Sequence, residues 1–221
     1  MSVIAIDIVS DTVCPWCYIG KRRLEAALRE RPALAVDVRW HPYQLAPELP
    51  PDGLARDAYL TAKFGSREAA REIFGRIADA GRGAGLDFRF DRIQRAPNTL
   101  DSHRLILWAG SAGCQDAVVE DLFRAYFRDG EDIGDPAVLV EIAARQGMDR
   151  ELVAELLAGD RDRDRVAREA AAARQAGISG VPAFIIGQRH AVAGAQEAAV
   201  FVEIFDRLAA GHRTPSTVSS S

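Results

Sequence analysis

The chain has 221 residues, of which 48% are hydrophobic and 27% are charged, and its formal net charge at pH 7 is −4. This length and apolar content provide for one well-buried domain with room for a large insertion. A mildly acidic chain lacks the basic surface that binding to nucleic acid or anionic lipid requires. No apolar run reaches the roughly 18 residues of a membrane span. We therefore expect neither nucleic acid nor membrane among its partners.

The N-terminal segment MSVIAIDIVSDTV lacks the basic start and the small-residue cleavage site of a secretory signal peptide. Three cysteines are also too few for a disulfide framework. We therefore expect a cytoplasmic protein, in which a C-x-x-C motif is more often catalytic or metal-binding than structural.

Residues 3–40 follow a strand–helix–strand pattern. The run VIAIDIV (3–9) is short, β-branched and nearly continuous in apolar residues, which is typical of a strand buried on both faces. Helical spacing begins at Pro15 and stops at Pro32, and LAVDVRW (34–40) alternates as a second strand. These three elements form a βαβ unit.

The middle of the chain is predicted to be helical. A proline-rich loop at 41–53 leaves the sheet, and an Ala-, Arg- and Glu-rich sequence with 3.6-residue periodicity follows it. Asn98 or Thr99 can cap one of the helices, and Asp135 with Pro136 can start another. The predicted helices are 54–64, 66–82, 98–112, 115–128, 136–146, 149–158 and 161–176.

The sequence returns to strand character after residue 177. Apolar pieces at 184–186 and 190–192 flank a Gly-Gln turn, which indicates a hairpin, and a helix at 195–210 precedes a polar tail. This order predicts an α/β protein with a thioredoxin-like fold and a large all-helical insertion. The predicted parts are a thioredoxin-like domain (1–44 and 177–211), an inserted helical subdomain (45–176) and a disordered tail (212–221).

The motif Cys14-Pro15-Trp16-Cys17 falls between the first predicted strand and the first predicted helix. Backbone N–H groups at a helix start have no partner within the helix, and together with the helix dipole they favour a thiolate there. Cys17 is about one turn further on, so its sulfur can reach back. We therefore expect Cys14 to be the nucleophile of thiol–disulfide exchange and Cys17 the resolving thiol, with Pro15 and Trp16 beside the substrate.

Two other uses of this motif fit the sequence less well. A zinc site needs two further ligands at suitable spacing, and the remaining candidates form no second C-x-x-C and no H-x-x-x-H motif. These candidates are Cys114, His41, His103, His190 and His212. A plain structural disulfide between Cys14 and Cys17 is the other alternative. We predict no bound metal, and no cofactor beyond the redox-active pair itself.

Val181 and Pro182 precede a predicted strand and are predicted to form the second part of the site. A proline at a strand start donates no ladder hydrogen bond. If the bond before Pro182 is cis, it makes a tight turn that can stand beside the cysteines. The exposed backbone of Val181 can then pair with an extended substrate. An ordinary trans turn proline is the alternative.

Several spaced motifs together resemble the DsbA family, and within it the FrnE-like branch, which is similar to 2-hydroxychromene-2-carboxylate isomerases and kappa-class glutathione transferases. The motifs are SDTVCPWCYIGKRRLE, PNTLDSHRL, LFRAYFRDGEDIGDPAVL and GISGVPAFIIG followed by AVAGAQ. The resemblance implies a thioredoxin fold with a helical insertion, a cis-proline at Pro182 and redox work by Cys14 and Cys17. It also implies three residues that face the active site from the insertion, namely Asn98, Thr99 and His103.

The resemblance leaves two functions open. The related isomerases and transferases carry a serine at the position of Cys14 and use glutathione. The cysteine therefore favours a thiol:disulfide oxidoreductase or isomerase that acts on a protein or small-molecule substrate, with glutathione as a candidate co-substrate. The alternative is a glutathione-dependent isomerase or transferase for an aromatic or polyketide-type molecule. Secreted DsbA proteins carry a signal peptide, so we do not expect a role in periplasmic folding.

Several other features have plainer interpretations. On the sequence alone His103 is equally well a packed or surface histidine, Cys114 an idle thiol, and the aromatic residues of 40–43 part of the core. The glycines of 81–88 follow no predicted strand, so they predict a helix end rather than a nucleotide site. An apolar surface on the insertion would allow a homodimer, although the sequence does not locate one.

Overall fold

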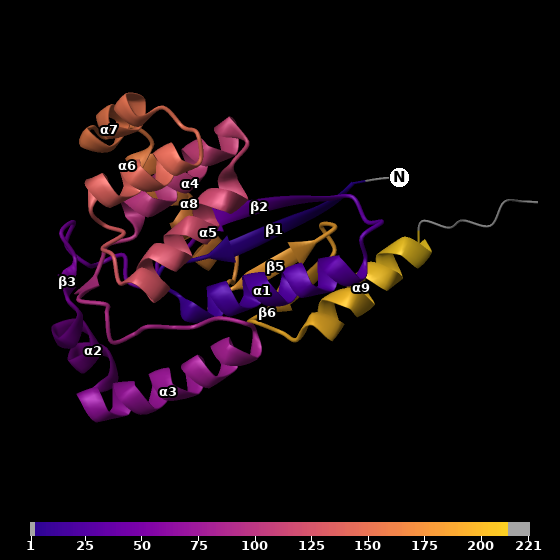
Figure 1. Cartoon of the computed structure of the whole chain (residues 1–221). Coiled ribbons are helices and arrows are strands. Elements are labelled where there is room, and N and C mark those ends of the chain that lie inside the picture. The colour runs from indigo at the N-terminus through magenta and orange to yellow at the C-terminus, as the bar shows by residue number, and fades with distance from the viewer. Residues whose placement is uncertain (1–2, 212–221) are drawn as a thin grey trace, which may run out of the picture.

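The structure, a computed structural model, describes residues 3–211 and is built around a four-stranded sheet (Figure 1). The strands are β1 (Ile4–Ser10), β2 (Val36–Pro42), β5 (Ala183–Ile186) and β6 (His190–Ala193), in the order β2-β1-β5-β6. β1 runs parallel to β2 and antiparallel to β5, and β5 is antiparallel to β6. The predicted combination of a βαβ unit with a β-hairpin in one α/β fold is confirmed.

One face of the sheet carries a hydrophobic core. Ile6 and Ile8 of β1 are buried on the side where α1 (Pro15–Glu30) and α9 (Ala198–Gly211) pack against each other (Figure 1). Phe184 of β5 is buried in the same layer. This packing fixes α1, and therefore the residues at its start, against the sheet.

The opposite face of the sheet is joined to α8 (Arg163–Gln175) by charged groups. His41 of β2 lies between two carboxylates, with its Nε2 2.9 Å from Oδ1 of Asp7 and its Nδ1 3.0 Å from Oε1 of Glu169. The hydrogen bond with Glu169 raises the pKa of His41 above its ordinary value of 6.5, against the effect of burial and with further help from Asp7. The same hydrogen bond lowers the pKa of Glu169. A protonated His41 therefore ties α8 to the sheet.

The pH dependence of stability tests this tie. Because the folded-state pKa of His41 is raised, its contribution is fully present below about pH 6.5 and is lost as the pH rises through the folded-state value. As the pH rises through that value, we expect the free energy of unfolding to fall by roughly 0.5–1 kcal/mol more in the wild-type protein than in His41→Gln. This figure is discounted for solvent screening, because the His41 side chain is 36% exposed. Urea unfolding at a series of pH values measures this difference.

His190→Gln is the matched control for that series, since His190 lies on β6 and has no carboxylate partner within residues 3–211. It should keep the wild-type pH dependence. Parallel curves for His41→Gln and wild type would contradict the tie.

The helices of the chain between β2 and β5 form two groups (Figure 1). Helices α4 to α8 pack as a bundle beside β2, whereas α2 and α3 lie apart from that bundle and α3 contacts α1. Within residues 3–211, no helix combines the length and the apolarity that crossing a membrane requires. The elements are β3 (Leu54–Ala55), α2 (Arg56–Phe64), α3 (Arg67–Gly83), β4 (Arg95–Ala96), α4 (Leu100–Ala112), α5 (Gln115–Arg124), a π-helical turn (Ala125–Asp129), α6 (Pro136–Arg145), α7 (Arg150–Ala158) and α8.

A series of aromatic rings joins α3 to the rest of the molecule. Tyr18 of α1 stacks on Phe123 of α5 with ring centroids 4.9 Å apart, and its ring is 6.2 Å from that of Phe88. Phe88 stacks on Phe90 at 5.0 Å, and Phe90 lies 4.8 Å from Phe74 of α3. Such pairs add about 0.5–1.5 kcal/mol each beyond the burial of their area. The series therefore holds α3 in a fixed place relative to α1.

The structure differs from the predicted elements in a few places. Leu54 and Ala55 pair with residues 95–96 as a short strand, so the helix predicted from residue 54 begins at Arg56. The helix predicted over 115–128 ends in the π-helical turn. The predicted disordered tail lies outside the described residues, and the limits of the inserted subdomain stay a prediction.

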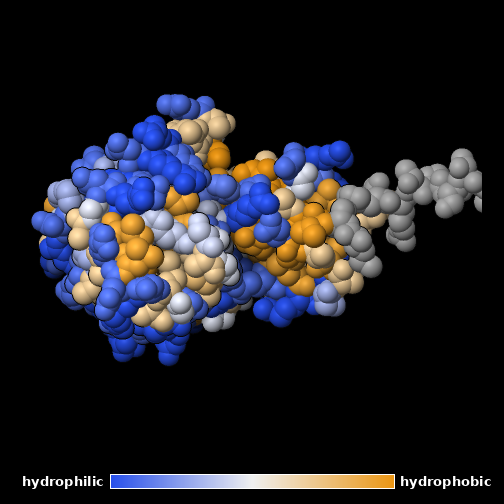
Figure 2. All heavy atoms as spheres, turned by 90° about the horizontal axis from the view of Figure 1, so that it is seen from above, coloured by the Kyte–Doolittle hydropathy of each residue, from blue (hydrophilic) through white to orange (hydrophobic). Residues whose placement is uncertain are grey.

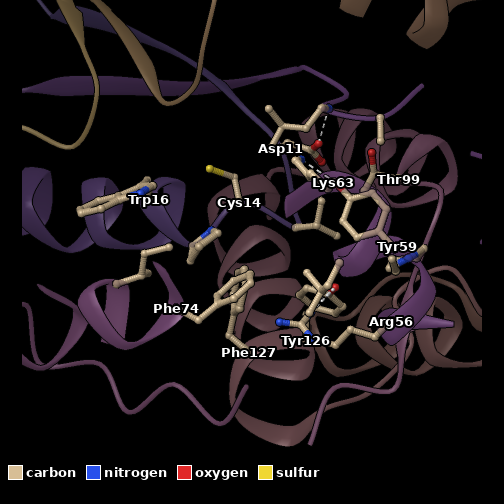
Figure 3. Close-up of a pocket in the computed structure, with 18 of the residues that line it drawn as sticks. Asp11, Cys14, Trp16, Arg56, Tyr59, Lys63, Phe74, Thr99, Tyr126 and Phe127 are labelled. Carbon is tan, nitrogen blue, oxygen red and sulfur yellow. Dashed lines mark hydrogen bonds between the residues drawn. The ribbon is translucent and has the colours of Figure 1, made fainter. Parts of the chain in front are cut away.

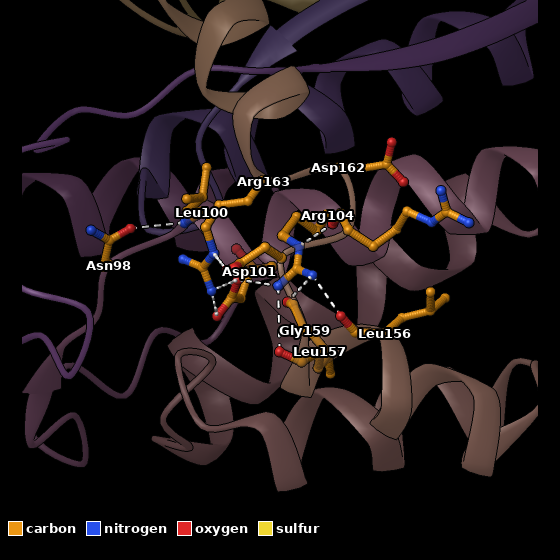
Figure 4. Close-up of polar contacts among 12 residues, drawn as sticks. Asn98, Leu100, Asp101, Arg104, Leu156, Leu157, Gly159, Asp162 and Arg163 are labelled. Atoms are coloured by element: carbon orange, nitrogen blue, oxygen red, sulfur yellow. Dashed lines mark hydrogen bonds and ion pairs between the residues drawn. The ribbon is translucent and has the colours of Figure 1, made fainter.

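Arg104 of α4 is completely buried and joins α4 to α7 and to the turn that follows α7 (Figure 4). Its Nε donates to the carbonyl of Arg161 at 2.8 Å, and its Nη2 donates to the carbonyls of Leu156 and Gly159 at 2.6 and 2.7 Å. Its Nη1 donates to Asp101 at 2.8 Å. The three carbonyls lie at the end of α7 and in the following turn, where carbonyl groups have no N–H donor within the helix. Arg104 thus supplies hydrogen-bond donors, from inside the bundle, to the carbonyl groups at and just after the end of α7.

Replacing Arg104 tests this role. Arg104→Leu removes the donors and leaves buried acceptors unpaired, so we expect the free energy of unfolding to fall by about 3 kcal/mol or more. Urea denaturation followed by circular dichroism measures the loss. Arg168→Leu, at an exposed position of α8, is the matched control and should change stability by less than about 0.5 kcal/mol. Similar stabilities for the two variants would show that Arg104 does not hold the bundle.

Candidate active site

Cys14 lies at the junction between β1 and α1. It is the N-cap of α1, with extended backbone angles, and Pro15 occupies the first turn of the helix. The Cys14 N–H donates to the carbonyl of Asp11 at 3.0 Å, which closes the turn that leads out of the strand. No side chain caps this helix start, and the Cys17 N–H donates to the Cys14 carbonyl at 3.0 Å, so the Cys14 sulfur lies at the positive end of the helix dipole.

The two thiols of the motif have different surroundings. Both are free and buried, with Cys14 5% and Cys17 1% exposed, but Cys14 lines a cavity and Cys17 does not. Burial raises the pKa of the Cys17 thiol well above its ordinary value, and the neighbouring Cys14 raises it further. Cys17 therefore stays protonated at neutral pH. Cys14 is the sulfur that a molecule from outside can reach.

The Val181–Pro182 turn lies against Cys14. The peptide between Val181 and Pro182 is cis, as the family resemblance implies. The Cys14 Sγ donates to the Val181 carbonyl over 3.6 Å. Gly20 of α1 permits the close approach, since a Cβ at that position would lie 3.0 Å from both Pro182 Cγ and Phe184 Cζ. The sequence predicted the turn but gave no sign of Gly20, because the contact exists only in the folded protein.

Asp11 is a buried carboxylate beside the motif that the sequence analysis did not single out. Its Oδ2 accepts from the Leu45 N–H at 2.7 Å, while its Oδ1 has no hydrogen-bond partner among the described residues. The Nε2 of His103 lies 3.5 Å from that Oδ1 but donates to the Tyr43 carbonyl at 2.9 Å. Since Asp11 also lines the cavity, its Oδ1 is an acceptor available near Cys14.

The residues that the resemblance predicts from the insertion are only partly on the wall of the site. Thr99 lines the cavity, but Asn98 and His103 do not. Asn98 donates to the Leu49 carbonyl at 2.7 Å and accepts from the Leu100 N–H at 3.0 Å (Figure 4), which fastens a cavity loop to the start of α4. The side chains of Asn98 and His103 hydrogen-bond to the backbone, and His103 also approaches Asp11 on the cavity wall, so their part in substrate binding stays a prediction.

A cavity of about 340 Å³ opens beside Cys14 (Figure 3). Pro15, Trp16 and Val181 line one part of it, and α2 and α3 line another. The volume falls within the range of small-molecule sites, which begins at about 300 Å³. Apolar residues dominate the rest of the lining, which includes Leu45, Leu49, Tyr59, Leu60, Phe64, Ile73, Phe74, Tyr126 and Phe127, with Asp11, Arg56 and Lys63 as the charged members.

Cys14 is the cysteine that lines this cavity. Within residues 3–211, no group of three or more histidine, cysteine, aspartate or glutamate side chains is placed to hold a metal ion. Cys114 is the N-cap of α5 and is not among the residues that line the cavity.

Such a sheet, with a C-x-x-C motif at the start of its first helix and a cis-proline against it, defines a thioredoxin-like protein with a dithiol site. Comparison with known families extends this assignment, because residues 5–206 match the family described as DSBA-like thioredoxin domain. The chain belongs to that family. The predicted resemblance to the DsbA family is confirmed.

Solved structures agree with this assignment. The chain is similar to a probable DsbA oxidoreductase from Streptomyces coelicolor, with 34% identity and a TM-score of 0.82 over 99% of this chain and 94% of that one. It shares its fold with a 2-hydroxychromene-2-carboxylate isomerase, at 14% identity and a TM-score of 0.71 over 94% and 97% of the two chains. It also shares its fold with the cytosolic disulfide reductase DsbM from Pseudomonas aeruginosa, solved with glutathione, at 20% identity and a TM-score of 0.65 over 95% and 100%.

The difference between the two thiols predicts selective alkylation. In a Cys114→Ser background near neutral pH, iodoacetamide should modify Cys14 at least about tenfold faster than Cys17, because Cys17 is buried and kept protonated. Peptide mapping by mass spectrometry after short exposures measures the two rates. Equal rates, or a faster reaction at Cys17, would contradict the assignment of Cys14 as the accessible thiol.

Proposed function

We propose that the protein is a thiol:disulfide oxidoreductase that works through Cys14 and Cys17. The observation that carries the proposal is the position of the Cys14 sulfur. It lies at an uncapped helix start, 3.6 Å from the Val181 carbonyl and on the wall of a cavity, with a buried thiol one turn behind it. Membership of the DSBA-like family supports the class of reaction.

The exchange takes place in two steps. The Cys14 thiolate attacks one sulfur of a substrate disulfide and forms a mixed disulfide, while the other substrate sulfur leaves as a thiolate with the electron pair of the broken bond. Cys17 then loses its proton and attacks the Cys14 sulfur, which releases the second substrate thiolate and joins the two cysteines. Two electrons pass from the pair to the substrate, and the reverse sequence oxidises a substrate dithiol. The unpartnered Oδ1 of Asp11 is an acceptor suited to the Cys17 proton.

The substrate disulfide lies between the C-x-x-C motif and the cis-proline turn in this proposal. Pro15 and Trp16 flank it, and the Val181 backbone is available to pair with an extended segment. We place glutathione as the thiol that resets the pair, in a cytoplasmic setting. The fold shared with a disulfide reductase that is described as cytosolic and was solved with glutathione supports this setting.

Single replacements of the three cysteines test the proposal. In an assay of insulin reduction by a thiol reductant, Cys14→Ser should lower the catalysed rate by about a hundredfold or more, because the attacking sulfur is gone. Cys17→Ser should accumulate a mixed disulfide at Cys14, which mass spectrometry detects. Cys114→Ser is the control and should keep wild-type activity. Full activity in Cys14→Ser would end the proposal.

A glutathione-dependent isomerase or transferase is the second candidate, and the aromatic cavity beside Cys14 is the observation that favours it. The fold shared with a 2-hydroxychromene-2-carboxylate isomerase is in keeping with it. In such an enzyme Cys14 would engage glutathione and Cys17 would be dispensable. Unimpaired turnover of an aromatic substrate by Cys17→Ser, with glutathione present, would favour this candidate over the oxidoreductase.

A further inference from the structure

One wall of the cavity beside Cys14 is the helix α2, which meets the rest of the protein through the contact of its Phe64 ring with Phe74 of α3. No residue of α2 is buried. Its residues Tyr59, Leu60, Lys63 and Phe64 recur at helical spacing, and all four line the cavity. The apolar stripe of an amphipathic helix normally packs on a core, but here it faces an open volume. We infer that this face of α2 contacts a ligand.

Aromatic side chains surround this volume. They come from α1, α2, α3 and the π-helical turn, and their rings offer flat apolar faces to a small ring-shaped ligand. A space of about 340 Å³ admits a small molecule rather than a folded protein. The rings belong to Trp16, Tyr59, Phe64, Phe74, Tyr126 and Phe127.

Two cations on the lining have no carboxylate partner within residues 3–211, although the chain carries 32 acidic residues against 28 lysines and arginines. Lys63 is exposed and donates to the Tyr59 hydroxyl at 2.7 Å. The guanidinium of Arg56 lies over the Phe74 ring, 5.0 Å from its centroid. Asp11 is the one carboxylate on the lining, and it is buried. The cavity therefore has two positive side chains and one negative one.

We propose that this cavity selects small aromatic disulfides that carry an anionic group, and that Lys63 recognises the charge. This proposal rests on the thiol–disulfide exchange at Cys14 proposed above. The ligand's ring contacts the aromatic wall, and its anion binds the Lys63 ammonium. That ammonium contacts the neutral hydroxyl and the ring of Tyr59, so no ion pair has to be broken when it binds an anion.

Dithiobis(nitrobenzoate), an aromatic disulfide with one carboxylate on each ring, is a probe of this class. Attack by the Cys14 thiolate on one probe sulfur breaks its S–S bond, forms a mixed disulfide and releases one thionitrobenzoate with the electron pair. Attack by Cys17 on the Cys14 sulfur releases the second, and the Cys17 proton passes to the buffer. Two electrons from the dithiol thus reduce one probe molecule. Dithiodipyridine is the matched neutral aromatic probe.

The experiment measures the second-order rate constants of both probes with reduced Cys114→Ser protein at low ionic strength. Lys63→Met should lower the rate constant for dithiobis(nitrobenzoate) about five- to tenfold, and should change that for dithiodipyridine less than about twofold. Lys63→Arg should restore most of the loss. Arg76→Met is the matched control, since it removes a charge from an exposed position of α3 outside the lining, and it should leave both rate constants near those of the parent protein.

Three results would overturn the inference. Equal losses of rate for both probes in Lys63→Met would mean that the substitution damages the cavity wall. An unchanged preference for the anionic probe would mean that Lys63 does not recognise its charge. An equal effect of Arg76→Met would mean that the overall electrostatic field of the protein, and not Lys63, attracts the anionic probe. The proposed function has a separate readout. The proposed function is wrong if Cys14→Ser reacts with dithiodipyridine as fast as the parent protein. A reaction that depends on Cys14 but shows no preference for the anionic probe contradicts only the role of Lys63.

Discussion

The antiparallel pairing of β5 with β1 is the constraint on which the site depends. Val9 pairs with Ala183, so the end of β1 and the residues just before β5 meet at one end of the sheet. Cys14 and Val181, which are 167 positions apart in the sequence, consequently touch. Gly20 lets α1 approach the turn closely enough for that contact. The reaction centre is therefore a product of strand register rather than of any one motif.

The helical insertion forms part of the wall of the cavity beside this reaction centre. The bundle of α4 to α8 is joined by the buried Arg104, and the aromatic series from Tyr18 to Phe74 holds α3 opposite the start of α1. Hydrophilic residues cover much of the helical end of the surface in Figure 2, whereas hydrophobic residues gather at the end that carries the sheet. The insertion thus keeps a hydrophilic exterior on this face while it lines the cavity with aromatic rings.

The sequence was sufficient for those parts of the site that follow from local chemistry. Cys14 before a helix, Cys17 one turn later and Pro182 before a strand could each be placed from spacing alone. The cavity wall could not, because the stripe of α2 that includes Tyr59 and Lys63 looks the same whether it packs on a core or faces a ligand. Asp11 and Gly20 owe their roles to contacts with distant segments. The sequence also could not reveal that backbone groups and Gln44 occupy the Asn98 side chain, whose role at the site stays a prediction.

The central claim is that Cys14 and Cys17 act as one two-electron redox pair beside the cis-proline turn. Equilibration of the protein in glutathione buffers of graded potential, with acid quench and mass spectrometry, tests it most directly. We expect a single reversible two-electron transition between the dithiol and an internal Cys14–Cys17 disulfide. Its reduction potential should lie in the range spanned by known disulfide donors and disulfide reductants. A lasting glutathione adduct on Cys14, with no internal disulfide at any potential, would contradict the account.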